Sequence, residues 1–96
     1  MNSKQRAYLK SLASNLDSLF QIGKNALTPD VTNAVSESFN THELVKITVL
    51  KNCDDNINEM ANALADRTSS TLVQVIGRKI VLYKPFKDDP QIVLPK

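Results

Sequence analysis

The stretch Gln21-Ile22-Gly23-Lys24-Asn25-Ala26-Leu27-Thr28-Pro29 connects an apolar run to the start of a helix. Gly23 frees the backbone where the chain turns, and it lets another backbone or a ligand come close. Thr28 can cap a helix that begins at Pro29, where the missing N–H group costs nothing. A helix start favours a phosphate because it carries unpaired N–H groups and a partial positive charge, to which Lys24 adds a full charge. The stretch alone therefore predicts either a loop that binds a polyanion backbone or an ordinary strand-to-helix turn.

Outward from this stretch, the hydrophobic pattern predicts three helices and four strands. Helices are expected over residues 4–16, 29–39 and 55–67, and strands over residues 19–22, 44–50, 71–76 and 79–83. Ser3 is the expected cap of the first helix, and the segment 52–55 supplies the expected cap of the third. Gly77-Arg78 places glycine first in a two-residue hairpin connection, as a type II′ turn prefers.

The predicted order α-β-α-β-α-β-β indicates an α/β fold with two layers. Strand–helix–strand units imply parallel neighbouring strands joined by right-handed crossovers, and the closing hairpin adds an antiparallel strand. We therefore expect a four-stranded mixed sheet with the second and third helices on one face, while the position of the first helix stays open. The domain is expected over residues 1–84, followed over residues 85–96 by a proline-containing tail that is extended along the body or partly disordered.

The composition of the 96 residues limits the possible functions. Cys53 is the only cysteine, so no intramolecular disulfide can form and a reducing compartment, the cytoplasm, is expected. His42, the only histidine, has no visible partner, so a capping or surface role is expected. Asp54, Asp55 and Glu59 could suggest a metal site, but acids at a helix start are explained by the helix dipole. With no catalytic constellation, cofactor motif or membrane-spanning run in view, we expect neither an enzyme nor a membrane protein.

The net charge of +2 is unevenly distributed along the chain. Residues 1–29 and residues 77–96 each carry +3, whereas residues 30–76 carry −4. If the two ends meet in space, the protein has a basic face that steers an anionic partner and an acidic back. The alternative is a chance scatter of surface charges, which is common in short chains.

Several short motifs follow one another in a defined order over nearly the whole chain. They are Ser3-Lys4-Gln5-Arg6 with Leu9 to Ala13, Gln21 to Asn25, Leu27-Thr28, His42-Glu43-Leu44, Gln74 to Arg78 with Leu82-Tyr83, and Leu94-Pro95. Together they resemble the bacterial YhbY-type proteins, which are single CRM domains (chloroplast RNA splicing and ribosome maturation). The resemblance implies a fold similar to the C-terminal domain of translation initiation factor three, RNA binding, and a role in maturation of the large ribosomal subunit.

The hallmark of this family is a GxxG loop, similar to the loop that KH domains use against the nucleic-acid backbone. The matching residues are Gly23, Lys24 and Asn25, with Ala26 in place of the second glycine. Because alanine resists positive φ and stands there without visible compensation, we expect a negative φ at Ala26. Basic residues outside the loop are further expected phosphate contacts, namely Arg78 and Lys79 at the hairpin, then Lys4, Arg6 and Lys10.

The expected partners are rRNA and the precursor of the large ribosomal subunit, bound by a monomer. Few exposed aromatic residues are evident, so we expect recognition of RNA shape more than base identity. Lys24 and Arg78 are expected at exposed turns, where replacement changes stability little. The alternative function is a protein-docking module that binds a ribosomal protein or another assembly factor through the acidic back or the apolar tail.

Overall fold

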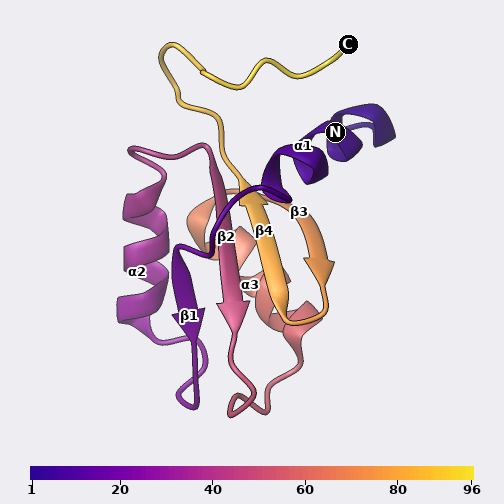
Figure 1. Cartoon of the computed structure of the whole chain (residues 1–96). Coiled ribbons are helices and arrows are strands. Elements are labelled where there is room, and N and C mark those ends of the chain that lie inside the picture. Colours follow the sequence, from indigo (N-terminus) through magenta and orange to yellow (C-terminus); the bar gives the residue numbers. More distant parts are fainter.

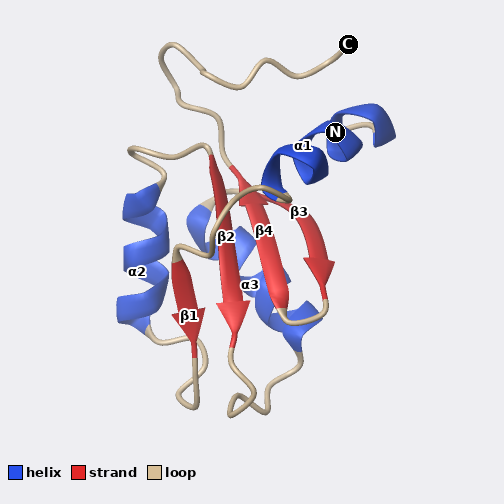
Figure 2. Ribbon diagram, viewed as in Figure 1, coloured by secondary structure: helices blue, strands red, loops and turns tan.

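Three helices and a four-stranded sheet make up the computed structural model, which describes residues 1–96 (Figure 1, Figure 2). The helices are α1 (Ser3–Ala13), α2 (Pro29–Ser38) and α3 (Ile57–Thr68). The strands are β1 (Phe20–Ile22), β2 (Leu44–Val49), β3 (Thr71–Ile76) and β4 (Lys79–Tyr83). The predicted element order and the α/β fold class are confirmed.

The strands form one mixed sheet in the order β1-β2-β4-β3. β1 and β2 are parallel neighbours joined through α2, as predicted. The expectation that β2 and β3 are also neighbours is wrong, because β4 folds back from the hairpin and pairs antiparallel with both strands. Gly77 has a φ of 56° and Arg78 has no positive φ, which fits the predicted type II′ turn.

The main core lies between the sheet and the helices α2 and α3, which cover the same face, as predicted. In β2, the alternating residues Val45, Ile47 and Val49 are at most 1% exposed and point into this core. α3 has the most complete apolar stripe of the three helices, with Met60, Ala61, Leu64 and Ala65 buried. Fully burying a methionine or leucine side chain stabilises a fold by about 1.5–3 kcal/mol.

The opposite face of the sheet is partly covered by α1, whose position the sequence left open. Leu9 and Ala13 pack in a second, smaller cluster with Val73, Val81 and Tyr83 of the sheet. α1 lies across the end of the sheet where β4 finishes, and the other half of this face is uncovered in Figure 1. The first helix therefore leaves a free sheet surface beside its own C-terminal end.

Only one of the three predicted helix-capping residues caps its helix in the structure. Thr28 caps α2, as predicted. The caps predicted for the other two helices are wrong: Asn2 caps α1 in a capping box with Gln5, and Asn56 caps α3. Asparagine is among the strongest capping residues, and in both cases it lies one residue outside the predicted position.

The tail after β4 folds back over the body of the protein. Glu43, only 4% exposed, accepts hydrogen bonds from three backbone N–H groups of this tail at 2.7–2.8 Å, those of Phe86, Gln91 and Ile92. Ile92 and Leu94 also pack against the cluster beneath α1. Glu43 is therefore an internal anchor for the tail and does not contribute to the acidic surface.

Candidate functional site

Three connections lie together at one end of the sheet: the β1–α2 loop, the β2–α3 loop and the β3–β4 hairpin (Figure 1). They meet there because β1, β2 and β3 run in the same direction, with β4 antiparallel between β2 and β3. The predicted loop residues 23–26 occupy the first connection, and Gly77-Arg78 occupies the third. The structure therefore brings the predicted loop and the predicted hairpin to the same edge.

The β1–α2 loop is a tight turn in which the N–H group of Ala26 donates to the carbonyl of Gly23 at 3.0 Å. Ala26 has a φ of 54°, so the predicted negative φ is wrong. A left-handed conformation costs an L-residue about 1–2 kcal/mol. The turn is maintained because Ala26 and Leu27 pack against the main core. The loop thus has at position 26 a backbone shape that glycine favours.

Glycine at position 23 is not required by the fold. Its φ is not positive. A Cβ atom there would lie 3.5 Å from Oδ1 of Asn52 and 3.6 Å from Cδ1 of Leu50, which are ordinary contact distances. Lys24 and Asn25, the next two residues, are exposed. Neither the backbone conformation nor the packing at position 23 therefore requires glycine.

Arg78 is half-buried, and its guanidinium group points into the protein. Nε donates to the carbonyl of Val49 at 2.9 Å, and Nη2 donates to the carbonyls of Leu50 and Cys53. The expectation of an exposed turn position is therefore wrong for Arg78, although its charge remains at the loop edge. Lys51, which the sequence did not single out, is exposed in the loop that Arg78 holds.

The cations of α1 divide into one structural residue and two exposed ones. Nη1 of Arg6 donates to the carbonyls of Leu72 and Val73 at 2.8 and 2.7 Å, where β3 bulges. Arg6 therefore links α1 to the irregular part of β3. Lys4 and Lys10 are exposed, and their side chains point away from any hydrogen-bond partner within the protein.

Lys10 and Lys79, two of the predicted residues, line one hollow of about 220 Å³ between residues 10–14, at the C-terminal end of α1, and residues 74–81 of the β3–β4 hairpin. We call it the α1 hollow. Gln74 and Ile76 also line it, and the sequence placed them in a family motif without predicting them as contact residues. One sequence feature could have pointed to this hollow: Ile76 is a large apolar residue at a strand end, next to the hairpin glycine. In the structure its side chain is 55% exposed.

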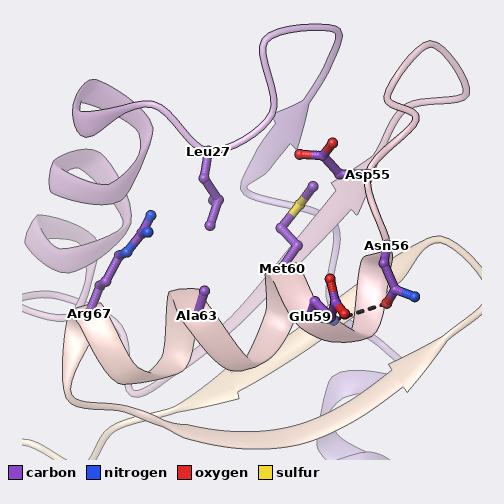
Figure 3. A pocket seen from close by; sticks show the side chains of 7 residues that line it. All are labelled: Leu27, Asp55, Asn56, Glu59, Met60, Ala63 and Arg67. Carbon is purple, nitrogen blue, oxygen red and sulfur yellow. Dashed lines mark hydrogen bonds between the residues drawn. The ribbon is translucent and has the colours of Figure 1, made fainter.

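The exposed side chains of α2 and α3 are mostly acidic. The exposed ionisable residues of the two helices are Asp30, Glu37, Glu59, Asp66 and Arg67, and Asp54 and Asp55 lie in the loop that precedes α3. Figure 3 shows a hollow of about 430 Å³ on this face, with Asp55 and Glu59 near the start of α3 and Arg67 near its end. The exposed lysines named above lie instead at the loop edge and beside α1. Charge is therefore only partly separated: Lys10 and Lys79 lie on the α1 side, whereas Asp54 and Asp55 share the loop edge with Lys24 and Lys51, and Lys87 lies near Glu37.

The titratable groups gather in no metal-binding cluster. No three histidine, cysteine, aspartate or glutamate side chains come together in a way that could hold a metal ion. None of the helices combines the length and the apolar character that crossing a bilayer requires. One pKa is clearly shifted: burial, and then the charge of the Glu43 carboxylate, raise the pKa of the Tyr83 phenol above 10.0. Tyr83 lies in the cluster beneath α1, where this shift reflects packing.

Comparison with known proteins places these features in a family. The chain is 40% identical over 95 residues to a Bacillus subtilis (strain 168) protein named "Probable RNA-binding protein YqeI", with 99% of both chains covered. It is 33% identical over 96 residues to a Haemophilus influenzae protein named "RNA-binding protein", covering 100% of this chain and 96% of the relative. The solution structure of SAV1595 from Staphylococcus aureus superposes with a TM-score of 0.83 at 41% identity, covering 99% of each chain.

The family model of the CRS1 / YhbY (CRM) domain matches residues 1–84. This range contains all three loops at the site edge and the whole of the α1 hollow. Both the match and the full-length similarity to the two relatives agree with the resemblance found in the sequence. The chain therefore belongs to the CRS1 / YhbY (CRM) domain family.

Proposed function

We propose that this protein binds the RNA backbone through residues 23–26 and assists maturation of the large ribosomal subunit. The observation that carries the proposal is Gly23, a glycine that neither backbone conformation nor packing requires, beside the exposed Lys24 and Asn25. The names of the two relatives, which describe RNA binding, support the same class of ligand. The loop therefore lets a phosphate come close to the protein backbone.

The cations and the helix start at the loop edge favour an anion, against the opposing charge of Asp54 and Asp55 in the β2–α3 connection and of Asp30 in the first turn of α2. The first N–H groups of α2 carry a partial positive charge directly after the loop. Lys24 and Lys51 add full charges at two of the three connections, and Arg78 adds a half-buried charge at the third. Contacts of this kind position a protein on RNA without reading sequence. We further propose that the protein recognises RNA by its shape more than by base identity. It would act as a monomer in the cytoplasm and without catalytic activity.

A salt titration of RNA binding tests this function, because phosphate contacts release counterions. If about 3–5 phosphates are neutralised, log K against log salt should fall with a slope between roughly −2 and −4. Lys24→Ala should flatten that slope by about 0.7 if the contacted RNA is single-stranded. Lys87→Ala removes an exposed charge from the tail and serves as the matched control. A slope near zero, or equal effects of both variants, would refute the loop as the contact.

The substitution Gly23→Ala tests the loop separately from its charge. A methyl group fits the protein at ordinary contact distances, so the unfolding free energy should change little. Bound RNA backbone would be held away from the loop, and affinity should fall by about 1 kcal/mol, the scale of one lost hydrogen bond. Unchanged affinity with an intact fold would contradict close approach at Gly23.

The second candidate function is protein docking through the acidic outer face of α2 and α3. The hollow in Figure 3 favours it, because Asp55 and Glu59 would repel a phosphate and attract a basic protein segment. The two functions can be separated by charge: Asp55→Asn with Glu59→Gln should weaken protein docking and leave RNA affinity unchanged.

A further inference from the structure

We propose that the α1 hollow seats one unpaired RNA base, while Lys10 and Lys79 contact the phosphates on either side of it. This inference rests on the proposed function, because it assumes that the ligand is RNA. It adds a base contact, on the uncovered face of the sheet, to the backbone contact at the loop. The RNA segment at this face of the sheet is then single-stranded.

The floor of the α1 hollow consists of two rows of directly paired residues. Lys46, Val81 and Gln74 form the first row, across β2, β4 and β3, and Lys79 and Ile76 form the next. Residues paired directly across strands share one face of a sheet, so their side chains all point to the side of α1. The C-terminal end of α1, with Ala13 and Ser14, supplies the wall.

The bulge in β3 determines which side chains reach the floor. The pairing passes from Leu72–Leu82 to Gln74–Val81, so Val73 is the extra residue. Val73 is 2% exposed and fills the space beneath α1. Gln74 is thereby left beside the hollow, where its amide can both donate to and accept from the edge of a base.

The lining combines an apolar surface with positive charge, which suits a nucleotide. Val81 and Ala13 form the apolar part of the floor, and Ile76 adds a large side chain that is 55% exposed. Lys10 and Lys79 are exposed at the rim. Nζ of Lys46, by contrast, donates to the carbonyls of Ala13 and Leu16, so it fixes the end of α1. A volume of about 220 Å³ is large enough for one base.

The hollow is continuous with the loop along the uncovered sheet face. Lys79 pairs with Thr48, which pairs with Gln21, two residues before Gly23. One row of side chains therefore runs from the hollow to the start of the loop. A single strand held by its backbone at the loop can pass along this row and place a base beside α1, as single-stranded regions permit.

Two probes separate the base contact from the backbone contact: an oligouridine and an abasic ribose-phosphate chain of the same length. Wild-type protein should bind the oligouridine about tenfold more tightly, a difference of about 1.4 kcal/mol. Ser14→Leu fills the hollow and should abolish this preference. Ser11→Leu places the same side chain on an exposed α1 position outside the hollow and should keep it. Thermal melts of each variant establish that it is folded.

Crosslinking of 4-thiouridine RNA to the wild-type protein needs no variant. Adducts in residues 10–14 or 74–81 support the proposal, and adducts confined to residues 23–28 overturn it. Equal affinity for the two probes also overturns the proposal that the hollow binds a base. If Lys24→Ala still lowers that equal affinity, the proposed function of the loop stands. Binding of neither probe would overturn both.

Discussion

Ala26 holds a backbone conformation that glycine adopts without steric cost. Ala26→Gly removes strain of about 1–2 kcal/mol, but the greater freedom of the unfolded chain costs about 0.4–1 kcal/mol, so we expect a net gain in stability of up to about 1.6 kcal/mol. RNA affinity should stay equal or rise. Ala7→Gly, at an exposed position within α1, is the matched control and should lose about 1 kcal/mol. Urea melts that show a loss at position 26 as well would contradict the strain.

Arg78 stabilises the loop edge from within, through three backbone carbonyls. Arg78→Ala leaves these acceptors without their charged donor and should lower the free energy of unfolding by about 1–3 kcal/mol. Lys79→Ala, one residue further on and exposed, should change it by less than about 0.5 kcal/mol. Equal, small losses in chemical denaturation would show that the guanidinium group is dispensable for folding.

Tyr83 links stability to alkaline pH. Its pKa is raised in the folded protein, first by burial and then by Glu43, so the native state retains the phenol proton that the unfolded state loses above pH 10.0. The stabilisation is complete below that pH and is lost as pH rises through the native pKa. The Tyr83→Phe variant cannot ionise at this position. Its free energy of unfolding should therefore fall less steeply than that of the wild-type protein between pH 9 and 11, about one unit on either side of the ordinary pKa. Parallel urea melts measure the difference. Identical slopes would contradict the shift.

Among the elements, those with a strong hydrophobic period could be predicted and those fixed by distant contacts could not. The stripe of α3 and the alternation in β2 specify their own buried faces. The φ of Ala26 depends on packing against the main core, and the inward turn of Arg78 depends on the carbonyls of another loop. Neither contact produces a recognisable local sequence pattern. The position of the loop could therefore be predicted from the sequence, but its conformation could not.

The tail is an element held by one buried carboxylate. Glu43→Gln replaces one oxygen by an NH₂ group, which cannot accept, and removes the charge from the remaining hydrogen bonds. We expect a loss of about 1.5–3 kcal/mol and faster hydrogen exchange at Phe86, Gln91 and Ile92. Glu37→Gln, on the exposed face of α2, is the control and should affect neither. Unchanged exchange in the tail would mean that packing of Ile92 and Leu94 alone holds it.

In the whole molecule, the sheet separates the exposed lysines beside α1 from the exposed carboxylates of α2 and α3. The sequence predicts a separation from the two chain ends, but the loop edge is mixed, because Asp54 and Asp55 lie there with Lys24 and Lys51. The position of α1 could not be derived from its own stripe, because its partners Val73 and Val81 lie sixty or more residues away in the chain, and Val73 reaches it through a bulge. The α1 hollow is a product of that packing.

The two surfaces make opposite predictions for the protein in cells. If the basic surface binds rRNA, tagged wild-type protein should sediment with large-subunit precursors in a sucrose gradient and be depleted from mature ribosomes. A Lys24→Ala/Lys79→Ala variant should then move to the top of the gradient, because two exposed charges at the proposed interface are lost. An Asp55→Asn/Glu59→Gln variant should stay with the precursors. The reverse pattern would assign the attachment to the acidic face and to a protein partner, and equal occupancy of small-subunit particles would contradict a role in large-subunit maturation.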